Sequence, residues 1–196
     1  PLVKEEFYKS NTHFKKKDKF NLLIAGGSQG ASIFDKDLKK FIIDISKKTP
    51  IKITQQTNEK NISHLSNYYT QNNIESKIFS FEKNFVKLVE QSDLCITRAG
   101  ASTLAELSIL NVPFIAVPLP TSKDNHQFEN AKFYKDNDSC WIIEQSHLET
   151  NIENVLKDII IKKVDYTRKK ESLKKLNYQN TWINVNQKIL RTINEN

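Results

Sequence analysis

The sequence has only two cysteines and four histidines among 196 residues. Cys95 and Cys140 each lie in a short apolar run, which favours buried free thiols of a reducing compartment over a disulfide. The histidines are scattered without the spacing of metal ligands, so no metal site is predicted. No apolar run approaches the roughly 18 to 20 residues that a bilayer span needs. A disulfide scaffold, a metalloprotein and an integral membrane protein are therefore all disfavoured.

Arginine is also scarce, with three among the 30 basic residues that give a net charge of +7. The lysine excess accompanies abundant Asn and Ile, which indicates a bias toward AT-rich codons. The basic runs at 15–19 and 162–175 carry no interleaved aromatic residue except Tyr166, so nucleic acid is not an expected partner. The charge is interpreted mainly as a solvated surface, with contact to an anionic membrane surface as the alternative.

Short apolar runs alternate with helical patterns along most of the chain. The runs predict strands at 20–26, 51–56, 77–81, 93–97, 114–117 and 140–143. Strands that are apolar on both faces are typical of a parallel sheet covered by helices on both sides. The predicted fold class is therefore α/β, with a doubly wound, Rossmann-like parallel six-stranded sheet.

The flanks of this pattern are polar and rich in lysine. Residues 1–19 have no sustained period and are predicted to be an interdomain linker, with the domain at 20–164. Residues 165–196 are predicted to form a C-terminal helical tail that packs on the sheet or on another domain. Because the chain begins at Pro1 without a leader, we expect a fragment of a longer protein.

All the glycines lie in two turns, each between a predicted strand and a predicted helix. Gly26, Gly27 and Gly30 belong to the first turn, and Gly100 belongs to the second. Helix N-termini at the carboxyl edge of a parallel sheet present free amides to anions, so the pair predicts an anion-binding cradle. The alternative is that the glycines only close tight turns.

The common nucleotide fingerprints are absent from these turns. The first turn is not G-x-G-x-x-G, the GK[ST] of a P-loop is missing, and residues 54–56 offer no carboxylate for a dinucleotide ribose. A dehydrogenase or a P-loop enzyme is disfavoured, and no cofactor is predicted.

Polar side chains follow the fourth and fifth predicted strands. Arg98 precedes Gly100, and the hydroxyls of Ser102 and Thr103 follow at a helix start, which suits a phosphate or diphosphate. Glu106 could accept both hydroxyls of a ribose, or it could cap its own helix in a box with Thr103.

The polar loop at 120–127 is a further candidate for ligand contact. Within it Asp124 or Asn125 could be an N-cap, and His126 could be a surface residue or a base.

The segments GGSQGAS, F-x-x-N-F, DLCITRAGASTLAELSILNVPFIAVPLP and KDNHQFENA together resemble the donor-binding half of the MurG family of glycosyltransferases, family 28. The resemblance covers nearly the whole chain. It implies the C-terminal domain of a GT-B fold, with an acceptor domain ahead of it in the intact enzyme.

The resemblance also implies a binding site for UDP-N-acetylglucosamine. The backbone at Glu82 would read the uracil edge, and Gln127 would bind the sugar. The predicted substrate-binding residues are Gly27, Ser28, Gln29, Glu82, Arg98, Ala101, Ser102, Thr103, Leu104, Ala105, Glu106 and Gln127. Val3, with Lys4 beside it, stands where the family often carries arginine, and His126 stands where other members have glutamine.

The implied reaction is an inverting transfer of N-acetylglucosamine to the lipid-linked muramyl-pentapeptide acceptor of peptidoglycan synthesis, which converts lipid I to lipid II. The catalytic residues are expected in the other half, so the isolated chain should be inactive. The implied location is the cytoplasmic face of the bacterial inner membrane, as a peripheral protein. Alternatives are a non-catalytic donor-binding subunit of a split transferase, a GT-B enzyme acting on another acceptor such as diacylglycerol, or a nucleotide-sugar epimerase.

Overall fold

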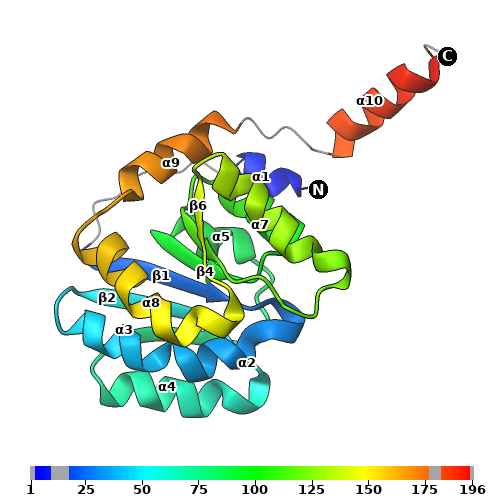
Figure 1. The fold of residues 1–196 in the computed structure, drawn as a ribbon. Coiled ribbons are helices and arrows are strands. Elements are labelled where there is room, and N and C mark those ends of the chain that lie inside the picture. Colours follow the sequence, from blue (N-terminus) through cyan, green and yellow to red (C-terminus); the bar gives the residue numbers. More distant parts are fainter. Residues whose placement is uncertain (1–2, 10–17, 177–181, 195–196) are drawn as a thin grey trace.

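The computed structural model describes residues 3–9, 18–176 and 182–194, and its core is one parallel sheet (Figure 1). The strand order is β3-β2-β1-β4-β5-β6, and every neighbouring pair is parallel. The strands are β1 (Phe20–Ala25), β2 (Ile51–Gln56), β3 (Glu75–Phe79), β4 (Leu94–Thr97), β5 (Phe114–Ala116) and β6 (Cys140–Ile142). The predicted doubly wound six-stranded sheet is confirmed.

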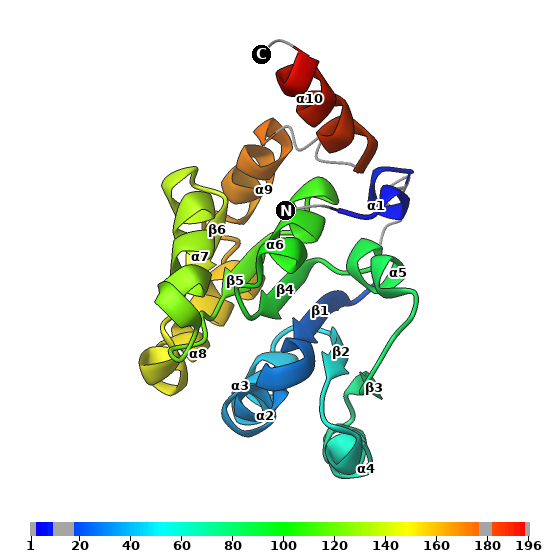
Figure 2. The same cartoon turned by 90° about the vertical axis from the view of Figure 1, so that its right-hand side faces the viewer.

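Helices cover both faces of the sheet (Figures 1 and 2). One layer contains α2 (Gly27–Asp37), α3 (Lys39–Ser46), α4 (Ile62–Gln71) and α8 (Leu148–Leu156), with short turns of helix at Glu59–Asn61, Gln145–His147 and Lys157–Ile161. The other layer contains α1 (Glu5–Lys9), α5 (Phe85–Glu90), α6 (Ala101–Ile109), α7 (His126–Asp136) and α9 (Tyr166–Lys175), with a short turn at Lys123–Asn125 before α7.

The strands β1, β4 and β5 each contribute to two buried clusters. In β1, Leu23 packs toward α6 whereas Leu22 and Ile24 pack toward α2. Successive side chains of a strand point to opposite faces, so a strand covered on both sides is apolar at every position. Cys95 and Cys140 are buried free thiols, and burial raises the pKa of both.

The third strand lies two residues earlier than the sequence predicts. It spans Glu75–Phe79 instead of 77–81, and its pairing ends where Gln56 of β2 faces Phe79. Phe81 is outside the strand with 81% of its surface exposed. An edge strand has one neighbour, so the end of β2 determines where β3 ends.

Segments on both sides of the predicted domain at 20–164 pack on it. Val3 and Phe7, within the predicted linker at 1–19, are buried in the cluster on the α6 side. In α9, Leu173 is buried, and the buried ammonium of Lys169 lies 2.9 Å from Asp138 Oδ1. A five-residue helix is too short to show a periodic pattern, which is why the sequence did not indicate α1.

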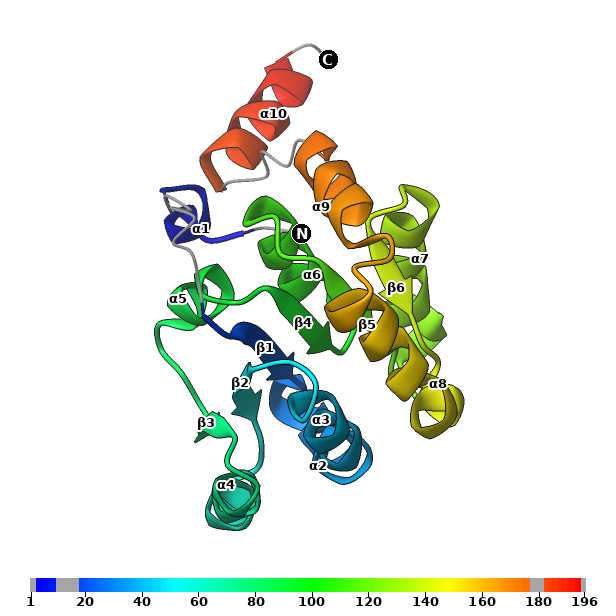
Figure 3. The same cartoon turned by 90° about the vertical axis from the view of Figure 1, so that its left-hand side faces the viewer.

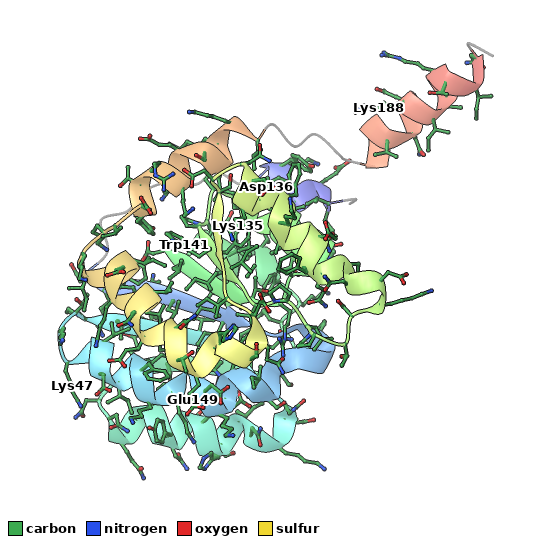
Figure 4. The ribbon with its side chains drawn as sticks, in the orientation of Figure 1. Lys47, Lys135, Asp136, Trp141, Glu149 and Lys188 are labelled. Atoms are coloured by element: carbon green, nitrogen blue, oxygen red, sulfur yellow. The ribbon has the colours of Figure 1, made fainter. Side chains whose placement is uncertain are left out.

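The last helix, α10 (Trp182–Asn194), lies away from the sheet in Figures 1, 2 and 3. Ile189, Leu190 and Ile193 are exposed on it. Figure 4 shows Lys188 on this helix, apart from the side chains that fill the space around the sheet. No helix in the described ranges is long and apolar enough to cross a membrane.

The packing of α1 gives the first prediction. Phe7 is 2% exposed, so Phe7→Ala should lower the free energy of unfolding by about 2 to 4 kcal/mol, measured by urea denaturation. Glu5→Ala, on the exposed side of the same helix, is the control and should change it by about 0.5 kcal/mol or less. If both variants are equally stable, residues 3–9 are a linker after all.

Candidate functional site

The site lies where the sheet changes direction, between β1 and β4. The chain moves outward from β1 through β2 to β3, and then returns to β4 on the other side of β1 (Figure 3). The helix after β1 packs on one face and the helix after β4 packs on the other. The N-termini of α2 and α6 therefore flank one crevice at the carboxyl edge, where ligands bind in open parallel sheets.

The two glycine turns differ in what their backbones require. Gly27 has a φ of +66°, a conformation that L-residues rarely adopt, whereas its counterpart Gly100 has an ordinary extended conformation with φ −67° and ψ 131°. A Cβ at either glycine would meet no atom within 4 Å. The fold thus explains a glycine at 27 but not at 100, and the open space at Gly100 favours close approach of a ligand.

The N-terminus of α6 provides free backbone donors. Gly100 is the N-cap, makes no side-chain cap, and accepts the first intrahelical bond from Leu104 N at 3.0 Å. The amides of the first helical turn, Ala101 to Thr103, have no partner within the helix. They point out of the helix start, where an anion would be stabilised.

Two of the predicted contact residues in α6 have buried side chains. Leu104 and Ala105 are completely buried, and the Leu104 N–H already bonds within the helix. Both side chains pack in the core on the α6 side, and the predicted contacts of these two residues with the donor stay predictions.

Glu106 cannot form the capping box with Thr103. In such a box the threonine is the N-cap, but here the N-cap is Gly100 and Glu106 is the sixth residue of the helix. Among the described residues, Lys4 and Glu6 act on its carboxylate through their charge, and none shifts its pKa through a hydrogen bond. Burial raises the pKa of Glu106 to about 7, with Lys4 lowering it and Glu6 raising it to smaller extents. The geometry leaves this carboxylate available for a ligand.

Two amide side chains of α7 hold the turn before α6. Gln127 Oε1 accepts from Ala99 N at 3.2 Å and from Leu119 N at 3.0 Å, and Asn130 Nδ2 donates to Ala99 O at 3.0 Å. The sequence pattern did not indicate this role of Asn130, although Asn130 lies one turn after Gln127 on the same helix face. The contact of Gln127 with the sugar stays a prediction. It would be made by the amide nitrogen, because the amide oxygen bonds with the backbone.

Arg98 is placed differently from its prediction. Its side chain is buried: Nη1 donates to Val117 O at 3.2 Å, and Nη2 donates to Gln145 Oε1 at 2.6 Å. The guanidinium lies 5.3 Å over the ring of Phe34, and burial lowers its pKa. These contacts tie β4 to the segments after β5 and β6. The predicted contact of Arg98 with a diphosphate stays a prediction.

The loop after β3 is held by Glu82. Lys77 Nζ lies 2.7 Å from Glu82 Oε2, and Glu82 Oε1 accepts from Asn84 N at 3.1 Å. The hydrogen bond from Lys77 holds the pKa of Glu82 below its usual range. The side chain is engaged within the loop, and the predicted contact to uracil stays a prediction for its backbone.

The remaining candidates lie in the first glycine turn and in the loop before α7. Gly27 N donates to Gln56 Oε1 at 3.1 Å, so this amide is already engaged. The side chains of Ser28 and Gln29 lie outside the described residues, while their backbones belong to α2. His126 is exposed, and its Nδ1 lies 2.7 Å from Lys123 O. Asn125 is the N-cap of α7 but makes no side-chain cap bond.

Comparison with known proteins gives consistent relatives. Residues 21–181 match the model of the glycosyltransferase family 28 C-terminal domain. The chain is 47% identical over all of its 196 residues to a Pelagibacter ubique (strain HTCC1062) protein, of which it covers 55%. That protein is named UDP-N-acetylglucosamine--N-acetylmuramyl-(pentapeptide) pyrophosphoryl-undecaprenol N-acetylglucosamine transferase.

A protein of the same name from Wolbachia sp. subsp. Drosophila simulans (strain wRi) is 34% identical over 155 residues, 78% of this chain and 45% of that protein. The crystal structure of Acinetobacter baumannii MurG matches with a TM-score of 0.79 at 26% identity, covering 90% of this chain and 51% of that one. The chain thus spans about half the length of the relatives it matches.

The raised pKa of Glu106 predicts a pH dependence of stability. The folded state keeps a proton that the unfolded state releases between its usual pKa of 4.5 and about 7, so this group lowers stability as pH rises through that window. Relative to wild type, Glu106→Gln should be equally stable at pH 4 and about 1 kcal/mol more stable at pH 8, allowing for solvent screening. Thermal unfolding at the two pH values measures the difference, and an equal difference at both would contradict the assignment.

For Arg98 we predict that substitution lowers the stability of the fold. Arg98→Lys loses the paired donors to Val117 and Gln145, so the free energy of unfolding should fall by about 2 kcal/mol. Affinities for UDP and for uridine should change by the same factor, because these contacts of the guanidinium are with the fold. Calorimetric titration with both ligands is the measurement. A loss confined to UDP would instead support the predicted contact with the diphosphate.

Proposed function

The chain belongs to the glycosyltransferase family 28 C-terminal domain family, and we propose that it is the donor-binding half of an enzyme that transfers N-acetylglucosamine from UDP-N-acetylglucosamine to lipid-linked muramyl-pentapeptide. The observation that carries the proposal is the pair of helix N-termini, α2 and α6, at the one crevice where the strand order reverses. The names of the relatives supply the donor and the acceptor.

The donor would span the carboxyl edge from β3 to β5. The diphosphate would bind the first-turn amides of α6 and the turn of α2 that includes Ser28, and the carboxylate of Glu106 would accept the ribose hydroxyls. The backbone at Glu82 would contact uracil, and the amide nitrogen of Gln127 would contact the sugar. The carboxylate of Glu106 and the open space at Gly100 support this placement.

The proposed reaction is a single displacement with inversion at C1 of the sugar. The 4-hydroxyl of the muramyl group forms the new bond to C1 and loses its proton, while the bond from C1 to the diphosphate oxygen breaks and UDP leaves with the electron pair. Charge that develops on the leaving group is stabilised by donors already in place. Each helix N-terminus contributes roughly 0.3 to 2 kcal/mol toward that charge.

The other half of the enzyme would supply the acceptor site and the group that takes the proton. We propose that the complete protein acts at the cytoplasmic face of the inner membrane as a peripheral enzyme of peptidoglycan synthesis. The lipid-linked acceptor named in the relatives requires access to a membrane, and the net charge of +7 suits an anionic lipid surface.

The test is binding without turnover. The chain of 196 residues should bind UDP and UDP-N-acetylglucosamine saturably in calorimetric titrations, and should not release UDP from the donor when acceptor is added. ADP and NAD are the controls and should bind at least about tenfold more weakly than UDP, since adenine does not present the uracil edge. Saturable binding of NAD with no binding of UDP would contradict the proposed function.

A further inference from the structure

Gln56, the last residue of β2, connects the two loops that flank it in the sheet. Its Oε1 accepts from the N–H of Gly27 in the turn after β1, at 3.1 Å. Its Nε2 donates to the carbonyl of Ser80 in the loop after β3, also at 3.1 Å. One planar amide group therefore holds the backbone of both neighbouring loops.

The position of Gln56 follows from the sheet. β2 lies between β1 and β3, and Gln56 is paired with Phe79, the residue before Ser80 (Figure 3). Carboxyl ends of parallel strands meet at one edge, so a side chain at the end of the middle strand reaches the loops on both sides. A second bond, from Thr57 N to Phe79 O at 2.8 Å, reinforces the junction with β3.

The two loops have different roles in the proposed site. The turn after β1 would contact the diphosphate, and the loop that contains Glu82 would contact the base. Glu82 in turn bonds with Lys77 and with the Asn84 amide, which connects the base loop to β3 and to the start of α5. The separation between the two loops then depends on the side chain that joins them.

We propose, on the basis of the proposed function, that Gln56 is a positioning residue that sets the distance between the base loop and the diphosphate turn. Its hydrogen bonds go to protein backbone and not to the ligand. It contributes to affinity only for a ligand that occupies both loops at once, because such a ligand needs them at one fixed separation.

The neighbouring residue Gln55 has a different task and provides a matched control. It points to the opposite face, where its Nε2 donates to Asp35 Oδ1 at 2.9 Å and its Oε1 accepts from Tyr69 at 2.8 Å. Gln55 is the same residue type on the same strand, and its bonds are as numerous, but neither reaches the two loops.

The experiment compares three probes on the same chain: UDP, uridine and inorganic pyrophosphate, each titrated by NMR. Gln56→Asn shortens the side chain by one methylene and should lower the affinity for UDP about tenfold, the equivalent of two neutral hydrogen bonds. Affinities for uridine and for pyrophosphate should each change by less than about threefold, because each loop can still bind its own part of the ligand.

Two further variants separate positioning from a loss of folding. Gln56→Glu keeps the length and the acceptor for Gly27 but faces Ser80 O with an oxygen in place of a donor, so it should show the same selective loss for UDP. Gln55→Asn should lower the melting temperature, and it should change the affinities for all three probes by one common factor.

The outcomes are distinguishable. A UDP affinity unchanged in both Gln56 variants, or an equal loss for all three probes, would overturn the role of Gln56. Failure of the wild-type chain to bind UDP would instead overturn the proposed function on which it rests.

Discussion

The reversal of strand order between β1 and β4 is the constraint on which the site depends. Connections between parallel strands keep one handedness, so a chain that moves outward on one side of β1 and then on the other must send its helices to opposite faces. The N-termini of α2 and α6 consequently face a common crevice. This topology alone brings the free amides, the glycines and Glu106 to the same edge of the sheet.

Polar side chains then fix the loops around the crevice. Asp35 in α2 accepts hydrogen bonds from Gln55, Thr57 and Asn61, which holds the helix against the end of β2. Gln127 and Asn130 hold the peptide before Gly100 from the other side. Buried polar groups in parallel-sheet proteins must find partners, and the partners of Gln127 and Asn130 belong to the turn before α6 that would bind the donor. The same hydrogen bonds of Gln127 and Asn130 provide partners for these side chains and hold the turn in place for a ligand.

The sequence predicted the strands, their parallel pairing and the two glycine turns, because apolar runs and turn residues are local signals. It left two roles open for Glu106, and the capping box with Thr103 is excluded because Gly100 is the N-cap and the box requires a start three residues later. It placed Arg98 at the edge, since spacing along a strand cannot show that a guanidinium turns toward Phe34 and Gln145. Bonds between residues far apart in sequence have no local signature.

Burial raises the pKa of Glu106 to about 7, so part of this carboxyl carries a proton near neutral pH. Under the proposed function the carboxylate accepts two ribose hydroxyls and must be free of that proton, so occupation of the crevice would release protons into the buffer. Binding heat would then include the ionisation heat of the buffer, and would differ between phosphate and Tris at equal affinity. Burial of Glu106 would thereby make donor binding a proton-releasing event.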